Sequence, residues 1–166
     1  MNRKLDSDLI TVIDQFARSG IHHPKIQYLN SGKSGDVYAY EDAFAIKVFK
    51  RKTRNKKDAF FLKHLQNIEG YPELYHYVPG EYMVTELVQG KTLFEIDGRN
   101  KQLIKDYKNE IEKVIAKTRS RGLYPHDLHL NNIMIDQSGK LYIVDVGKFS
   151  YKESRGSYRV TALWTS

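Results

Sequence analysis

The hydrophobic pattern of the chain changes near Gly90, from short strand-like runs before this residue to helical spacing after it. Strands are predicted in the first part at Ile26–Leu29, Asp36–Tyr40, Phe44–Phe49, Tyr75–Val78 and Tyr82–Leu87. A group of strands followed by a group of helices is typical of an α+β fold with a cleft between its two halves. The length of 166 residues allows one domain built as two small lobes, but not two ordinary domains.

Apolar residues recur at helical spacing in three segments. These segments are Ser7–Ser19, Lys57–Gln66 and about Asn100–Arg121. Two further short strands, Ile133–Ile135 and Leu141–Val144, flank a turn of Asp, Gln, Ser and Gly. The sequence therefore predicts an N-terminal helix, a five-stranded antiparallel sheet interrupted by one helix, and then a small helical part.

The composition limits the chemistry that the chain can carry. It has no cysteine, which excludes disulfides, thiolate metal sites and cysteine nucleophiles, so any metal must be held by oxygen or imidazole. The net charge of +7 favours an anionic partner. Much of this charge lies in the basic segment Lys50–Lys57, for which a solvated connection is favoured over a surface that binds an acidic partner or nucleic acid.

The sequence also bears on location. No run approaches the roughly 20 consecutive apolar residues that a membrane-spanning helix requires. The N-terminus carries Asp6 and Asp8 where a secretory signal would be apolar. We therefore expect a cytoplasmic protein without a membrane span.

Acidic and amide side chains in the last third of the chain form the strongest chemical motif. Asp127 and Asn132 are five residues apart, and Asp145 precedes Gly147 by two residues. Carboxylate and amide oxygens are ligands that magnesium prefers, and glycine permits a tight turn after a ligand. Such residues are singly more often turn formers or helix caps. Their order around two predicted strands favours a shared site.

This order resembles the protein-kinase-like superfamily. Asp127 and Asn132 match its catalytic loop, Asp-x-x-x-x-Asn, and Asp145 begins an Asp-Val-Gly that stands in the place of Asp-Phe-Gly. The resemblance implies that Asp127 orients an attacking hydroxyl and accepts its proton. It also implies that Asn132 and Asp145 hold magnesium against the phosphates of a nucleotide. The similar region extends from about Ile26 to Gly147.

The segment Leu29–Val37 resembles the glycine-rich nucleotide loop of the same family, with Asn30 in place of its first glycine. The residues expected to contact nucleotide here are Asn30, Gly32, Gly35 and Val37. For this segment alone, an ordinary hairpin turn is an equal alternative. A P-loop is rejected because its first glycine would fall at Gln27.

Ala45-Ile46-Lys47 resembles the Ala-x-Lys of the third kinase strand, whose lysine contacts the α- and β-phosphates. The alternative is an exposed lysine on an alternating strand. Kinases pair this lysine with an acid on the next helix. Asp58 stands in that place, although the family prefers Glu and Asp58 could instead cap the helix. Glu69 and Glu73 are poorer candidates.

Glu86-Leu87-Val88 resembles the hinge between kinase lobes. The resemblance implies that the Glu86 carbonyl and the Val88 amide bind adenine, with Thr85 at the rear of the pocket. It also implies that Lys47 faces Asp145 across the cleft.

The chain departs from the family in three ways. Pro125-His126 replaces the usual His-Arg, so regulation through a phosphorylated activation segment is not expected. His129 stands where protein kinases commonly carry lysine, which is more similar to lipopolysaccharide-core, RIO-type and aminoglycoside kinases. Only Lys148–Ser166 follow the Asp-Val-Gly, so the chain is either a minimal kinase or a fragment.

The resemblance therefore implies a two-lobed kinase-like fold over residues 1–166, with an N-lobe of about 1–88 and a truncated C-lobe of about 89–166. The expected function is ATP- and magnesium-dependent phosphate transfer to a hydroxyl, preferably on serine or threonine of a protein. One alternative is a small-molecule or sugar acceptor. Another is a pseudokinase scaffold that binds nucleotide without transferring phosphate.

Overall fold

The computed structural model describes residues 5–50, 57–97, 101–126 and 128–153. In chain order the elements are α1 (Ser7–Ser19), β1 (Ile26–Ser31), β2 (Gly35–Tyr40), β3 (Phe44–Phe49), α2 (Asp58–His64), β4 (Leu74–Val78), β5 (Tyr82–Glu86), β6 (Gly90–Thr92), α3 (Leu93–Asp97), α4 (Lys101–Ser120), the 3₁₀ turn η1 (Leu130–Asn132), β7 (Ile133–Asp136) and β8 (Leu141–Ile143). The chain forms two compact units. The first combines Met1–Ala59 with Glu73–Leu87, and the second combines Phe60–Pro72 with Val88–Ser166.

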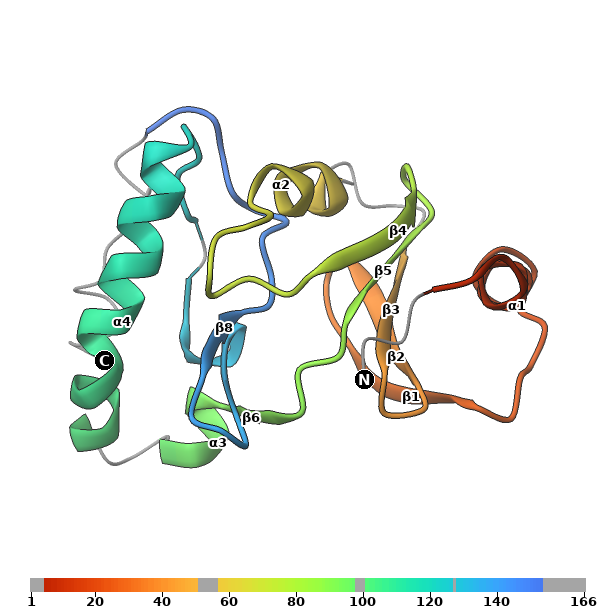
Figure 1. The fold of residues 1–166 in the computed structure, drawn as a ribbon, viewed down its shortest axis with the longest axis horizontal. Helices are drawn as coiled ribbons and strands as arrows, with labels where there is room; N and C mark the ends of the chain where they lie inside the picture. The colour runs from red at the N-terminus through yellow and green to blue at the C-terminus, as the bar shows by residue number, and fades with distance from the viewer. Residues whose placement is uncertain (1–4, 51–56, 98–100, 127, 154–166) are drawn as a thin grey trace. The chain divides into compact units, whose positions relative to one another are not determined.

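The first unit is built on an antiparallel sheet with the strand order β1-β2-β3-β5-β4 (Figure 1). This confirms the predicted five-stranded sheet. Ile46 of β3 pairs with Val84 of β5, and both are fully buried in a cluster with Ile13 of α1. Because side chains alternate along a strand, one face of the sheet packs on α1 and the neighbouring residues point to the other face.

α1 has the bounds that the sequence predicts. Its N-cap is Asp6, whose carboxylate accepts a hydrogen bond of 2.8 Å from the Leu9 amide. The Tyr82 hydroxyl donates to Asp14 at 3.0 Å and so ties the helix to the sheet. Burial, and next the hydrogen bond to Asp14, raise the pKa of Tyr82, so its hydroxyl stays a donor.

The second unit contains a smaller antiparallel sheet in the order β6-β7-β8, beside the long helix α4 (Figure 1). The sequence predicts β7, β8 and α4 to within about a residue of their observed ends, but not β6 or α3. β6 has only three residues, too few for a period-two pattern. Gly90 in β6 lies so close to β7 that an added Cβ would be 2.0 Å from the Ile135 carbonyl oxygen. β6 therefore forms because it pairs with β7, and not because of a local sequence pattern.

The segment Phe60–Pro72, which the sequence assigns to the N-lobe, groups with the second unit. Its Gly70 carbonyl accepts a hydrogen bond of 2.8 Å from the Ile143 amide of β8. The Tyr71 hydroxyl lies 2.6 Å from the buried Thr118 hydroxyl of α4. These polar contacts, formed away from water, fix the segment on β8 and α4.

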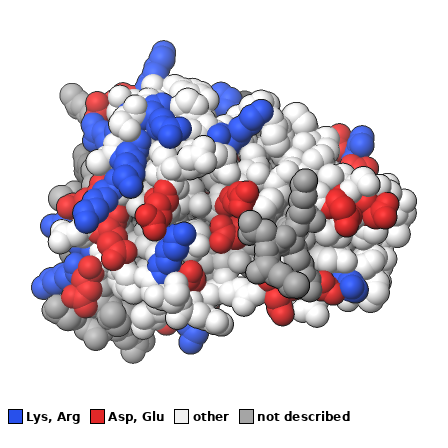
Figure 2. Space-filling view, viewed as in Figure 1, with Lys and Arg blue, Asp and Glu red and all other residues white. Residues whose placement is uncertain are grey.

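Figure 2 shows basic and acidic side chains interleaved over α4, where Lys108 and Glu112 form an i,i+4 ion pair of 3.9 Å. Among the described residues, no helix is long and apolar enough to cross a bilayer. Ile111, Val114 and Ile115 of α4 are buried and lie at helical spacing, so the described part of this helix has one apolar face.

Gly70→Ala is expected to destabilise the protein by about 2–3 kcal/mol. Gly70 has a φ of +107°, and a Cβ there would lie 2.6 Å from a methyl group of Val114. Gly139→Ala is the matched control, because Gly139 has a φ of +86° but open space around it; its cost should be about 1 kcal/mol. Urea unfolding measures both. Equal losses would show that the contact with Val114 relaxes and adds nothing.

Candidate active site

The predicted nucleotide loop is a tight hairpin turn between β1 and β2. The Gly32 amide donates to the Gly35 carbonyl at 2.9 Å, and Asn30 pairs with Val37 after a bulge in β1. A Cβ on Gly35 would lie 2.6 Å from the Val48 carbonyl oxygen, whereas a Cβ on Gly32 would have its nearest neighbour at 3.6 Å. Packing against β3 therefore requires Gly35, while the fold leaves room at Gly32.

Several of the predicted nucleotide residues share one face of the large sheet. Val37 pairs with Lys47, and Ala45 pairs with Thr85. Paired residues of antiparallel strands point to the same side, and residues two apart on one strand do so as well. The face opposite α1 therefore carries small side chains beside a lysine, and a flat apolar group could lie against such a surface.

Lys47 and Asp58 form an ion pair within the first unit. The Lys47 ammonium donates to the Asp58 carboxylate at 2.5 Å, and the two side chains are 12% and 0% exposed. Asp58 is the first residue of α2, and Ala59 packs beside it against Phe49 and Met83. The sequence alternative of an exposed lysine is therefore wrong. Asp58, and not the poorer candidates Glu69 and Glu73, forms the ion pair described here.

The hinge residues lie at the end of β5 and just beyond it. The Glu86 carbonyl accepts a hydrogen bond of 3.1 Å from the Thr85 hydroxyl, and the Glu86 amide donates to the Glu73 carbonyl at 2.8 Å. The Glu86 carboxylate also accepts from the Glu73 amide at 3.2 Å. Val88 is half-buried and is the first residue of Val88–Ser166, which belongs to the second unit. Binding of adenine by Glu86 and Val88 stays a prediction.

The two predicted metal ligands lie at the same end of the β7–β8 hairpin. Asn132 closes η1 and Asp145 follows β8, and the Val144 amide donates to the Asn132 carbonyl at 3.0 Å. The Asn132 side-chain amide donates to the His129 ring at 3.4 Å. The Asp145 carboxylate accepts from the Gly147 amide at 3.0 Å, which forms the tight turn expected at this glycine.

The turn at the far end of this hairpin fixes its register. The Asp136 carboxylate accepts from the Ser138 hydroxyl at 2.7 Å, and from the amides of Lys140 and Ser138 at 2.9 and 2.8 Å. The Ser138 hydroxyl is the largest cause of the lowered pKa of Asp136, and the two amides lower it further. Asp136 is therefore a structural acid that holds β7 against β8.

The donor set of Asn132 and Asp145 fits magnesium, which takes hard oxygen ligands and is commonly bound by one or two carboxylates together with substrate phosphates. Within the described part of the chain, no group of three or more His, Asp or Glu side chains forms a closed metal cage. These two oxygen-bearing side chains would thus need phosphate oxygens and water to complete an octahedral shell.

Asp127, the predicted catalytic acid, lies outside the described residues. The segments on either side of the motif are joined by a β-bridge between Tyr124 and Ser150, whose amides and carbonyls exchange hydrogen bonds of 2.8 and 3.0 Å. This bridge connects the chain before Asp127 to the chain after Asp145.

Lys50 contacts the glycine turn, which the sequence pattern does not predict. In the sequence Lys50 is the start of the basic segment Lys50–Lys57, of which residues 51–56 lie outside the described part of the chain. In the structure the Lys50 ammonium donates to the Ser31 hydroxyl and the Gly32 carbonyl at 2.8 and 2.7 Å. Alternation along a strand predicts which face a lysine leaves from, but not how far its flexible chain then reaches.

Comparison with known proteins finds serine/threonine kinases. The chain is 24% identical over 130 residues to a Bacillus subtilis (strain 168) protein with the provisional name serine/threonine-protein kinase YrzF, covering 75% of this chain and 60% of that protein. It is 28% identical over 142 residues to a Lactococcus lactis protein with the provisional name serine/threonine-protein kinase PknB, covering 74% and 23%. CBL-interacting serine/threonine-protein kinase 9 of Arabidopsis thaliana is 28% identical over 131 residues, covering 74% and 29%.

The chain spans less than two thirds of the length of each of these relatives. No family model matches it. Among solved structures, the Cydia pomonella granulovirus kinase PK-1 superposes with a TM-score of 0.64 at 18% identity, covering 87% of this chain and 57% of that chain. At this identity the likeness shows a shared fold.

Proposed function

We propose that this chain, which belongs to the protein-kinase-like superfamily, transfers the γ-phosphate of ATP to a hydroxyl group in a magnesium-dependent reaction. The observation that carries the proposal is the Lys47–Asp58 pair on the sheet face that also presents Val37 and Ala45. A lysine held by a buried acid beside small apolar side chains supports the binding of phosphates next to a flat base.

Positioning and charge neutralisation supply most of the catalysis in phosphoryl transfer. Lys47 would hold the α- and β-phosphates, and Asp58 would fix its ammonium. Asn132 and Asp145 would hold magnesium, which neutralises charge on the phosphate oxygens when it is bound. Their common placement at one end of the β7–β8 hairpin supports this role.

Asp127 would accept the proton of the acceptor hydroxyl. As that oxygen forms a bond to the γ-phosphorus, the bond from this phosphorus to the β–γ bridging oxygen breaks, and ADP leaves. The proton passes to the Asp127 carboxylate. Asp127 thereby aligns the hydroxyl and removes its proton in the same step.

The preferred acceptor is serine or threonine of a protein, because the similar proteins are named as serine/threonine kinases. Transfer of radiolabelled phosphate from ATP, screened against proteins and small metabolites, tests this choice. Labelling of a sugar or another metabolite alone would favour the small-molecule alternative. An acidic partner for the basic segment and a cytoplasmic location stay predictions.

The test of the function itself is titration with ATP and magnesium, followed by the transfer assay with the wild-type protein. Saturable binding that requires magnesium, with incorporation of label, is the expected result. Binding without any transfer would favour the pseudokinase alternative. A wild-type protein that binds no ATP in the presence of magnesium would contradict the proposal.

Gly32→Ala is expected to weaken ATP binding by about 5- to 10-fold, the scale of one lost hydrogen bond, with little change in stability. The fold leaves room for a Cβ at Gly32, so the added methyl group would obstruct only a ligand that approaches the backbone. Isothermal titration and thermal unfolding measure the two effects.

Gly35→Ala provides the contrast, because its Cβ would meet the Val48 carbonyl and should destabilise the sheet itself. If Gly32→Ala binds ATP as tightly as the wild-type protein, the turn is an ordinary hairpin and not a phosphate-binding loop.

A further inference from the structure

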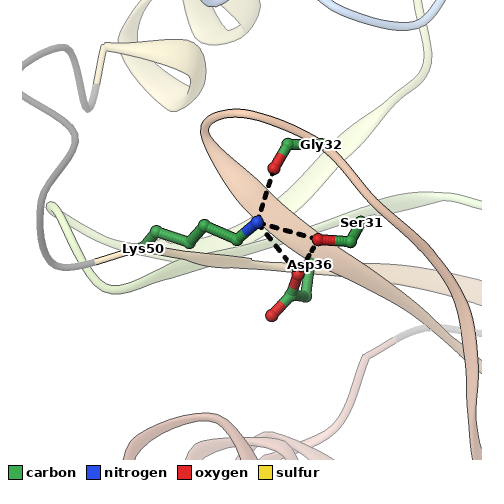
Figure 3. A network of polar contacts seen from close by, with 4 residues as sticks. All are labelled: Ser31, Gly32, Asp36 and Lys50. Atoms are coloured by element: carbon green, nitrogen blue, oxygen red, sulfur yellow. Dashed lines mark hydrogen bonds and ion pairs between the residues drawn. The ribbon is translucent and has the colours of Figure 1, made fainter.

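Lys50, the first residue after β3, reaches across the sheet edge to the glycine turn (Figure 3). Its ammonium donates to the Ser31 hydroxyl at 2.8 Å and to the Gly32 carbonyl at 2.7 Å, and it lies 3.6 Å from the Asp36 carboxylate. One side chain therefore contacts the end of β1, the turn and the start of β2.

The contacted groups are themselves connected. Ser31 and Asp36 are cross-strand partners, and the Ser31 hydroxyl donates to the Asp36 carboxylate at 2.5 Å. The Lys50 amide donates to the Ser34 carbonyl at 2.9 Å, which fixes the point from which the side chain starts. The network thus joins β3 to both sides of the turn through backbone and side-chain bonds.

Lys50 and Asp36 are 42% and 35% exposed, and ion pairs at such exposure add little to global stability. These contacts are better explained by an effect on the order of the glycine turn itself. A turn containing two glycines has large conformational freedom before it is ordered, and a fixed donor that bonds Gly32 and Ser31 reduces that freedom.

Charge gives a second reason for this arrangement. Asp36 directly follows Gly35, so its carboxylate lies beside the turn that is proposed to receive phosphates. A negative charge there repels an anionic ligand, and the repulsion is strongest at low ionic strength. The Lys50 ammonium at 3.6 Å offsets this charge.

We propose that Lys50 is a positioning residue that holds the glycine turn in the shape that receives nucleotide phosphates and offsets the charge of Asp36. This inference rests on the proposed function of the turn. It makes Lys50 a determinant of nucleotide affinity through the loop, with no direct part in the transfer of phosphate.

The test compares Lys50→Met with Lys25→Met. Lys25 forms an exposed 2.8 Å ion pair with Glu41 at the opposite end of the β1–β2 hairpin, so the control makes the same change in charge and also breaks an ion pair. Three quantities are measured: amide hydrogen exchange of residues 31–36 without nucleotide, the affinity for ATP with magnesium, and turnover at saturating ATP.

Lys50→Met should accelerate exchange in the turn by about 3- to 10-fold and weaken ATP binding by about 5- to 20-fold, the scale of one or two lost charge-assisted hydrogen bonds. Turnover at saturating ATP should change less than about threefold, because the loss is in binding. Lys25→Met should change each quantity less than about twofold. Lys50→Arg, which keeps the charge and the donors, should recover most of the affinity.

A second variant separates the effect of charge from the effect of loop shape. In the Lys50→Met background, Asp36→Asn should restore part of the affinity for ATP, because it removes the carboxylate that Lys50 no longer offsets. Affinity that does not recover would overturn the part of the proposal that concerns charge.

Exchange and affinity equal to those of Lys25→Met would overturn the proposal as a whole. The exchange measurement requires no ligand, so it tests the role of Lys50 in the turn separately from the proposed binding of ATP. If the wild-type protein binds no ATP, the proposed function is wrong, and exchange alone decides whether Lys50 holds the turn.

Discussion

Asp127→Ala is expected to lower turnover by about 10²- to 10⁴-fold while ATP and magnesium still bind, the usual scale for a positioned acid–base residue. Its proposed role begins when the acceptor hydroxyl is in place, so its removal should affect kcat and leave nucleotide affinity nearly unchanged. Single-turnover transfer of radiolabel, with nucleotide binding measured in parallel, separates the two quantities. Asp106→Ala is a matched control, because Asp106 is an exposed acid on α4.

Asp145→Ala should differ from Asp127→Ala in kind. Asp145 is a proposed magnesium ligand, so its loss should weaken magnesium-dependent binding of ATP and thereby lower transfer. Asn132→Ala should resemble Asp145→Ala, since both side chains lie at one end of the β7–β8 hairpin. Transfer by Asp127→Ala at the wild-type rate would show that this residue has no catalytic role.

Lys47→Met is expected to cost about 3–5 kcal/mol of stability, in addition to its effect on ATP binding. The Asp58 side chain is fully buried, and the substitution removes the ammonium that neutralises it. Removing one member of a buried ion pair leaves a desolvated charge, which costs much more than the pair itself contributes. Chemical unfolding measures this loss without any assumption about function.

Two further variants test that explanation. Lys25→Met breaks an exposed ion pair on the same sheet and should cost less than about 1 kcal/mol. The double variant Lys47→Met with Asp58→Leu removes both charges and should recover most of the stability lost in Lys47→Met. A loss for Lys47→Met no greater than that for Lys25→Met would show that the Asp58 carboxylate does not depend on Lys47.

The ion pair and the predicted phosphate contact make competing demands on Lys47. Its ammonium already bonds Asp58, and a lysine ammonium carries three donors in all. Replacement by Arg would keep the charge but present a planar fork in place of a compact ammonium. The stability of Lys47→Arg should therefore lie between that of Lys47→Met and that of the wild-type protein. The short Asp58 side chain, where the family prefers Glu, suits a lysine that lies close to the start of α2.

Local patterns in the sequence were sufficient for elements in which many residues share one period. α1 was predicted with its observed bounds because its apolar spacing, its acidic N-cap and Gly20 all agree. The order of the five strands along the chain follows from alternating residues and turn signals, whereas the pairing of Lys47 with Asp58 is expected from the resemblance to kinases. Such features depend on neighbours in the sequence, and a single chain contains that information.

Tertiary structure decided what depends on residues far apart in the sequence. β6 is a strand because Gly90 can approach β7 closely, and Phe60–Pro72 groups with the second unit because Gly70 and Tyr71 bond β8 and α4. In the sequence Lys50 belongs to a run of charged residues, and only the structure shows that its ammonium bonds the glycine turn. The sequence by itself thus determined most of the elements, but not β6 or α3, and the chemical types of the candidate site. Only the folded chain decided which distant groups meet, because long-range pairing and side-chain reach depend on packing rather than on local periodicity.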